Sequence, residues 1–269
     1  MRRTLVALAF VGAPAMAGAQ TDFYNTDRNR PIRIEDAYAT ERYSFDAHLA
    51  PIRLERSKGG VYNWGIDPEL AYGIFPRTQL ELGIPVGYTD LGESRRRAGL
   101  AGIDLSVLYN LNAETTTLPA LGIRASTLFP VGNLAPENVH PSIQGMVTRT
   151  LGWARFHVNA EYTFGSEPEA VNGLGAGAVE LARWTTGVAV DRTFPLKSTL
   201  LTGEVYARQP IHEDEAVEWN AGVGVRHQLD PLTAVDAGFG RRLTADDRSW
   251  FVTFGLARVF SFPFLMPGR

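Results

Sequence analysis

Histidine and serine are the residue types in this sequence that could cleave an ester or lipid bond. A serine becomes a nucleophile when a histidine takes its proton and a third group orients that histidine. The sequence offers His140 with Ser142 and His227 with Ser198, and neither pair lies in a nucleophile motif. The five histidines also lack the spacing of a metal site. We therefore predict no catalytic residue, no bound metal and no cofactor.

A glycine-rich stretch raises the question of dinucleotide binding. Gly173, Gly175 and Ala178 fit the pattern G-x-G-x-x-A, which binds a pyrophosphate only between a strand and a helix. Here a polar loop precedes the pattern, and VELARWTTGVAV, with a two-residue period, follows it. A loop is the better interpretation.

Alternation of apolar and polar residues is the dominant pattern of the chain. In WARFHVNAEYTF, Phe156 and Val158 alternate with Arg155, His157 and Asn159. Such alternation is typical of a β-strand with one apolar and one wet face. About twelve segments share it, each near the ~10 residues of a tilted membrane-spanning strand. Their predicted ranges are 42–55, 61–75, 79–91, 99–112, 118–131, 140–150, 153–164, 180–194, 198–210, 216–229, 233–244 and 249–262.

The connections between these segments alternate as well. Tight turns such as PRT at Pro76 and PLK at Pro195 are followed by longer polar loops such as GNLAPENVH. Short turns at one rim and long loops at the other are typical of an outer-membrane barrel. We predict an all-β fold, a transmembrane antiparallel up-and-down β-barrel of about twelve strands. A soluble β-sandwich is the alternative, disfavoured by the number of strands and by the charges on their polar faces.

The first residues have the pattern of an export signal. Arg2 and Arg3 precede an apolar run, and Ala17-Gly18-Ala19 supplies the small residues of a cleavage site. We predict a signal peptide at residues 1–19, cleaved before Gln20, and a location in the bacterial outer membrane.

The remainder of the chain divides into three parts. Residues 20–41 are polar and have no sustained period, so they form either a periplasmic tail or a partial plug of the barrel. The barrel is expected at residues 42–262, followed by a C-terminal extension at 263–269.

Charge and cysteine content limit the function further. Without Arg2 and Arg3, 24 basic residues stand against 29 acidic ones, a net charge of −5. This balance gives no electrostatic support to a nucleic-acid partner. The chain has no cysteine, so the fold must be held together without disulfides.

The polar row of the predicted strands would face the barrel lumen. Opposite charges there could pair across neighbouring strands and keep the lumen rigid and hydrated. They could also set the field in a selective path, and we expect both roles. The predicted lumen-lining residues are Asp104, Arg124, Arg155, His157, Glu161, Arg183, Glu204, Arg208, Glu218, Arg226 and Asp236.

Several stretches resemble the "MetA-pathway of phenol degradation" outer-membrane family. They are YGIFPRTQLELGIPVGY, GLAGIDLSVLYNLN, LPALGIRASTLFPVGN and the segment that begins GVGVRHQLDPLTAVDAGFG. Their order and spacing, from about Val61 to Phe260, carry the similarity. The resemblance implies a transporter-like barrel that takes up small, aromatic or hydrophobic solutes, and it brings no catalytic residues. The ending FPFLMPGR departs from the aromatic residue on which many such barrels end.

The predicted function is therefore passive uptake of small solutes by an outer-membrane channel or transporter. Its expected partners are membrane lipid and a small-molecule solute. A structural or adhesion barrel acting through its outer loops is the first alternative, and an outer-membrane lipid-modifying enzyme is the second. Barrels of about eight strands are filled by side chains and those of ~16–18 leave an open channel. Twelve strands fall between these cases.

Overall fold

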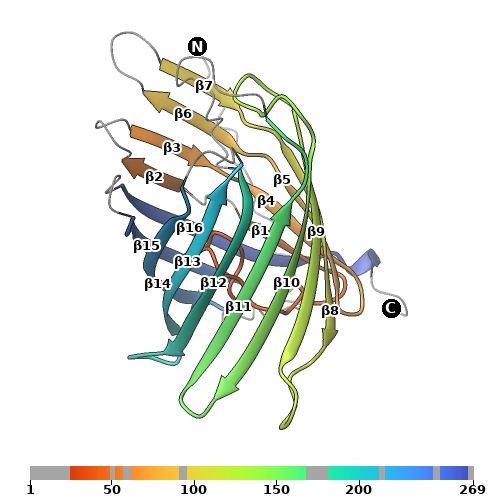
Figure 1. Cartoon of the computed structure of the whole chain (residues 1–269). Coiled ribbons are helices and arrows are strands. Elements are labelled where there is room, and N and C mark those ends of the chain that lie inside the picture. Colours follow the sequence, from red (N-terminus) through yellow and green to blue (C-terminus); the bar gives the residue numbers. More distant parts are fainter. Residues whose placement is uncertain are drawn as a thin grey trace, which may run out of the picture.

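The segments with a two-residue period form the strands of a closed antiparallel barrel in the computed structural model (Figure 1). The structure describes residues 25–48, 52–56, 62–90, 96–167, 181–211, 216–244 and 249–265. The predicted signal peptide and the glycine pattern at Gly173 lie outside these residues, as does most of the predicted C-terminal extension. Within the described part, no helix has the length and hydropathy needed to cross a membrane.

Eight barrel strands are continuous, and each pairs antiparallel with its neighbours in chain order. In the β10–β11 pair, for example, Val147 lies opposite Val158. These strands are β9 (Ala120–Phe129), β10 (His140–Leu151), β11 (Ala154–Thr163), β12 (Ala182–Thr193), β13 (Thr199–Pro210), β14 (Glu218–Asp230), β15 (Thr233–Arg242) and β16 (Trp250–Ser261).

The first four barrel strands each consist of two pieces, where the sequence pattern predicted continuous segments. The pieces toward the tight turns are β1 (Ser44–His48), β4 (Glu69–Phe75), β5 (Thr78–Gly83) and β8 (Ile103–Asn112). The pieces toward the long loops are β2 (Ile52–Arg56), β3 (Tyr62–Ile66), β6 (Val86–Asp90) and β7 (Arg96–Leu100).

Proline explains two of these breaks. Pro68 separates β3 from β4 and Pro85 separates β5 from β6, and neither residue has an N–H to donate to the ladder. Their carbonyls still accept bonds from the next strand, Pro68 from the Ile84 N–H at 3.0 Å and Pro85 from the Ala101 N–H at 2.8 Å. The sheet therefore stays joined across the breaks.

The barrel closes between its first and last strands. Both β1 and β2 pair with β16, with Ser44 opposite Ser261 and Arg56 opposite Trp250. Counted as pairs of pieces, the broken strands bring the barrel to twelve strands. The predicted all-β, antiparallel, twelve-stranded barrel is confirmed. The chain ends its described part in η3 (Pro263–Leu265), a short 3₁₀ turn.

The two faces of the wall differ as the alternation predicts. In β8, Leu105 and Val107 are 46% and 42% exposed, whereas Ser106 and Leu108 are buried. The same division holds in β11, where Val158 is exposed and His157 is buried. An outward apolar band of this kind is what a membrane-spanning barrel presents to lipid.

Candidate functional site: the charged lumen and its inserted segment

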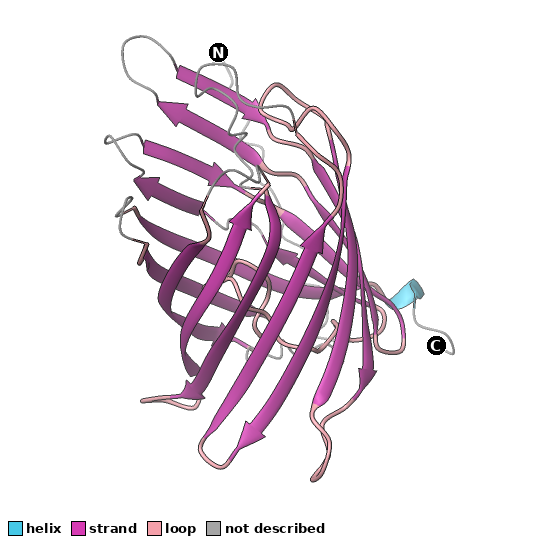
Figure 2. Ribbon diagram, viewed as in Figure 1, coloured by secondary structure: helices cyan, strands magenta, loops and turns pink. Residues whose placement is uncertain are grey.

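Residues 25–43, here named the inserted segment, run inside the barrel (Figure 2). Ile32 and Ile34 are 2% and 1% exposed and pack against Ala189 of β12 and Tyr206 of β13. Farther along, Ala37 is fully buried against β8, β9 and β10. The segment therefore contacts the inner face of the wall on both sides of the lumen.

Glycines in the wall make room for the inserted segment. A Cβ atom at Gly238 would lie 2.3 Å from the carbonyl oxygen of Pro31, and one at Gly224 would lie 2.6 Å from Pro31 Cγ. A Cβ at Gly187 would meet Ile34 Cδ1 at 2.8 Å. Any larger residue at these positions would collide with the segment, so the wall and the segment fit each other closely.

Arg124 on β9 forms the main charged contact with the segment. Its Nε and Nη2 atoms donate to the two Glu35 carboxylate oxygens at 3.1 and 2.7 Å. Its Nη1 atom donates to Glu81 at 3.1 Å and to Ser106 at 2.7 Å. Arg124 and Glu35 are each 3% exposed in their side chains. A buried, two-pronged pair of this kind is strongly directional.

A second network surrounds Asp36 of the segment. One Asp36 oxygen accepts the Thr26 N–H at 3.0 Å and lies 3.8 Å from Arg155 Nη1. Arg155 also donates to Asp191 at 2.8 Å, directly across from it on β12. His157 bonds the same Asp191 oxygen at 2.9 Å. Two of the predicted lumen residues, Arg155 and His157, are thus brought together around Asp191.

Arg226 and Asp236, cross-strand partners on β14 and β15, hold the start of the segment. Arg226 Nη2 donates to Asp27 Oδ2 at 2.7 Å, and Asp236 accepts from Arg30 Nη2 at 2.7 Å. On the opposite side, Arg28 pairs with Glu161 at 3.1 Å. Predicted lumen residues on opposite sides of the barrel therefore form ion pairs with the segment.

Glu204 meets the backbone of the segment. One of its carboxylate oxygens accepts the N–H groups of Arg33 and Ile34 at 2.8 and 3.0 Å. Asp104 lies at the edge of the same lumen, 4.0 Å from Arg28.

The remaining predicted residues bond other parts of the wall. Arg208 and Glu218, opposite each other on β13 and β14, pair at 2.5 Å as the cross-strand reading expects. Arg183 donates to the carbonyl oxygens of Thr163 and Gly165 at the rim of the long loops. It supports the backbone there and does not join the charged networks described above.

The inserted segment is the part of the site for which sequence reasoning had no decisive signal. Its charges, Arg28, Arg30, Glu35 and Asp36, show no strand period, so the pattern favoured a periplasmic tail and left a partial plug as the alternative. A dense mixture of both charge signs beside apolar Ile32 was the available clue. Segments of that composition can pair with a charged wall.

Burial perturbs the carboxyl groups of the segment. It raises the pKa of Glu35 to about 7, although the neighbouring Arg124 acts to lower it. It likewise raises the pKa of Asp36 to about 6 against the charges of Arg155 and His157. Burial would also raise the pKa of Asp27, but Arg226 and the other nearby positive charges hold it below its ordinary range.

Two cavities lie beside the segment. The outer one, toward the long loops, contains about 720 Å³ of empty space, part of it open to solvent, and its lining includes Arg28, Arg33 and Asp104. The inner one, toward the tight turns, contains about 840 Å³ of empty space, again part of it open to solvent, and its lining includes Tyr38 and Glu41. Because the segment contributes residues to both, it lies between them.

Comparison with known proteins settles the family. The model of the family described as "Putative MetA-pathway of phenol degradation" matches residues 59–260. The chain belongs to this family. The resemblance noted in the sequence is thereby confirmed. A search of curated proteins found no match.

Solved structures agree on the fold. An outer-membrane channel from Pseudomonas putida F1 superposes with a TM-score of 0.61 at 14% identity, over 84% of this chain and 98% of that chain. The translocator domain of the autotransporter NalP from Neisseria meningitidis gives a TM-score of 0.53 at 10% identity, over 81% and 89% of the two chains. The fold is that of an outer-membrane β-barrel.

Among the described residues, the histidine and serine candidates of this family member bond other partners than each other. His140 bonds Glu167 and Ser142 bonds Ser126, while His227 bonds Thr199. Thr148, His157 and Asp191 do line up in the order hydroxyl, imidazole, carboxylate, at 3.0 and 2.9 Å. Thr148 is fully buried, however, and its hydroxyl oxygen accepts the Ala37 N–H at 3.0 Å. A substrate cannot approach this hydroxyl while the segment is in place.

Proposed function

We propose that this protein is an outer-membrane channel for the passive uptake of small solutes, with the inserted segment as its constriction. The observation that carries the proposal is the lumen: charged walls face a segment with a cavity on either side of it. A solute that entered from outside would meet the outer cavity first, and then the segment.

The outer cavity favours positively charged or neutral solutes over anions. In the described part of the chain, its lining contains five carboxyl groups and two guanidinium groups. Fixed charges in a confined path act through a lower effective dielectric than bulk water, so they bias which solutes enter. Pro85, Leu128 and Leu181 add apolar surface to the same lining.

The solute class that we propose is small aromatic or hydrophobic compounds. The support is the description of the family, which refers to phenol degradation, together with the apolar part of the outer cavity. We further propose that the chain is exported with residues 1–19 removed, which is what its N-terminal pattern predicts. The protein would act without catalysis.

Conductance measurement tests the proposal. Purified protein in planar bilayers should conduct weakly, and a variant that lacks residues 25–38 should conduct more because its constriction is gone. Under a salt gradient, the reversal potential should indicate cation preference. Swelling of liposomes should be faster with small phenols than with sugars of similar size. A barrel that folds but does not conduct with or without the segment would favour the structural or adhesion alternative.

A further inference from the structure

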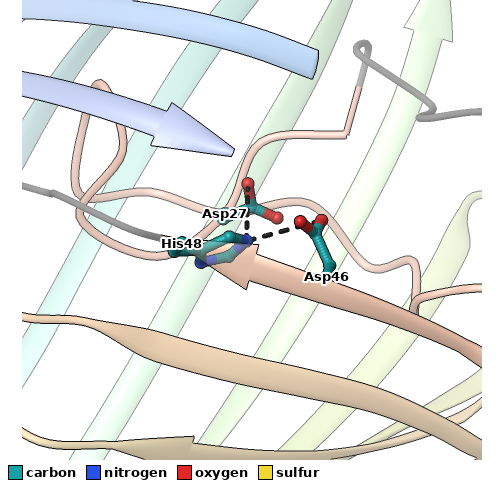
Figure 3. Close-up of side chains that lie close together, drawn as sticks. All are labelled: Asp27, Asp46 and His48. Atoms are coloured by element: carbon teal, nitrogen blue, oxygen red, sulfur yellow. Dashed lines mark ion pairs between the residues drawn. The ribbon is translucent and has the colours of Figure 1, made fainter. Parts of the chain in front are cut away.

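Asp27, Asp46 and His48 lie together where the inserted segment meets the barrel wall (Figure 3). Asp46 and His48 are alternate residues of β1, so they share its inner face, and Asp27 comes from the segment. His48 Nε2 lies 3.4 Å from Asp46 Oδ2 and 3.7 Å from Asp27 Oδ2. The three side chains converge from two separate parts of the chain.

The His48 ring is buried, with its Nε2 atom unbonded. The residue is 2% exposed, and Nε2 has no hydrogen-bond partner among the described residues. Asp46 Oδ1 is buried without a partner in the same sense. A buried polar atom left unpaired is destabilising, because it has lost its bonds to water. Both atoms therefore have an unused capacity to bind a ligand, and Nε2 is directed at the two carboxylates.

The other ring nitrogen of His48 is already oriented. His48 Nδ1 lies 3.0 Å from Glu69 Oε2. A carboxylate on Nδ1 favours an N–H there, so that in the neutral ring the lone pair of Nε2 points toward Asp27 and Asp46, where a metal ion would take the place of a proton. Metal-binding histidines almost always have such a carboxylate, carbonyl or water on the second nitrogen. Glu69 fills that position here.

The distances from His48 Nε2 to the two carboxylates suit a small divalent ion. Ligands at about 2.0–2.2 Å in a tetrahedral zinc site lie about 3.3–3.6 Å from one another. The two distances from His48 Nε2 lie within or close to this range, whereas both are long for a hydrogen bond.

The local charge balance also suits a divalent ion. Among the described residues, and with His48 neutral, four carboxylates face two guanidinium groups, which leaves an excess of two negative charges. The groups are Asp27, Asp46, Glu69, Asp236, Arg30 and Arg226. Arg226 contacts the same Asp27 oxygen at 2.7 Å, so a metal would bind that carboxylate beside the arginine. One divalent cation would neutralise the cluster.

We propose that His48 Nε2 and the carboxylates of Asp46 and Asp27 form a binding site for a divalent transition metal of the Zn²⁺ type. An imidazole nitrogen favours zinc over calcium or magnesium, which take oxygen ligands. Because Asp27 belongs to the inserted segment and the other two residues to the wall, a bound ion fastens the segment in the lumen. This fastening role rests on the proposed function, whereas metal binding itself does not.

Titration of the purified, metal-free full-length protein with Zn²⁺ alone tests the site. Calorimetry should show one ion per barrel, and His48→Gln or Asp46→Asn should weaken binding at least tenfold. Glu69→Gln should weaken it by about 10- to 100-fold through the histidine. His227→Gln is the matched control, since its ring bonds Thr199 at the tight-turn end, and it should bind as wild type does.

X-ray absorption of the zinc-loaded protein should show one imidazole among oxygen ligands, and Ca²⁺ should not compete. Absence of binding in the wild type, or equal binding by His48→Gln and His227→Gln, would overturn the site. The heat-dependent gel shift of barrels checks that each variant folds. If His48→Gln does not fold, Asp46→Asn replaces it as the test variant.

Hydrogen exchange of the inserted segment tests the fastening role. Zn²⁺ should slow exchange of residues 25–36 in the wild type and leave it unchanged in His48→Gln. Zinc that binds without changing this exchange would refute the fastening role. A barrel that binds zinc but never conducts would leave the metal site standing and remove the channel proposal.

Discussion

Replacing Gly238 by alanine should drive the inserted segment away from the wall. The new Cβ would lie 2.3 Å from the carbonyl oxygen of Pro31 and 2.5 Å from Thr253 Oγ1. Thr253 Oγ1 itself donates to the Pro31 oxygen at 2.9 Å. The new Cβ would therefore displace both the Pro31 carbonyl and the Thr253 hydroxyl. Gly238 does not have a positive φ, so alanine brings no backbone strain, and its clashes are with Pro31 of the segment and with Thr253 of the neighbouring strand β16.

The size of the effect follows from packing. Overpacking of a tight contact costs about 1–3 kcal/mol, and losing the bond from Thr253 adds about 0.5–1.5 kcal/mol. Because 1.4 kcal/mol is a factor of ten, even about 2 kcal/mol lowers the docking equilibrium of the segment roughly 30-fold. Gly224→Ala should act in the same direction, because its Cβ would lie 2.6 Å from Pro31 Cγ.

Exchange and conductance together measure this effect. In Gly238→Ala, amides of residues 25–36 should exchange faster by about 30-fold or more, and channel conductance should rise. Gly145→Ala is the control, because a Cβ there meets no atom within 4 Å. If Gly238→Ala exchanged and conducted like Gly145→Ala, our account of how the wall holds the segment would be refuted. Faster exchange without added conductance would show that the segment does not limit passage.

Three further predictions concern the membrane face, pH and export. Leu105→Arg should lower the free energy of unfolding in lipid vesicles by about 2–4 kcal/mol, because this side chain faces lipid near mid-strand; urea titration measures it, and a loss no larger than that of Leu105→Ala would contradict the facing. Since the docked segment has raised pKa values for Glu35 and Asp36, docking should be favoured in mildly acidic solution and weaken as pH rises through about 6 and then 7. Hydrogen exchange of the segment, corrected for intrinsic rates, should be slower at pH 5 than at pH 8, and Glu35→Gln should reduce this difference. Faster exchange at pH 5 in the wild type would contradict the predicted pH dependence of docking. Bulky residues in place of Ala17 and Ala19 should leave an uncleaved precursor at the inner membrane, visible by immunoblot, and a native chain found in the cytoplasm would exclude export.

The barrel could be predicted from sequence because its physical signal is local. Each strand must alternate lipid-facing and lumen-facing residues, so segments such as the one around Val158 identify themselves. Cross-strand pairs such as Arg208 with Glu218 follow from the same period. The breaks at Pro68 and Pro85 were not predicted, although a proline within a strand indicates an interruption. The alternating pattern continues past both prolines because their carbonyls keep the two pieces in one sheet.

The lumen resisted prediction because its contacts are not local. Arg124 meets Glu35 across 89 positions, and Arg30 meets Asp236 across 206. No period in the sequence connects such residues. The alternating pattern of the strands predicted only that their polar row faces a hydrated lumen. Ser106 and Asn159 in that row are instead 6% and 4% exposed, since the inserted segment occupies the space.

The same non-local contacts suggest why the wall combines glycines with charges. Glycine at 224 and 238 lets the backbone of the segment approach the wall, and the segment supplies part of the charge that pairs with the wall arginines. Removal of the segment would leave Arg124 with Glu81 but without Glu35, and Arg226 without Asp27. Because breaking a buried pair costs about 3–5 kcal/mol when one partner is lost, the segment should leave only if water enters the lumen with its departure. We therefore expect hydration of the lumen and release of the segment to occur together.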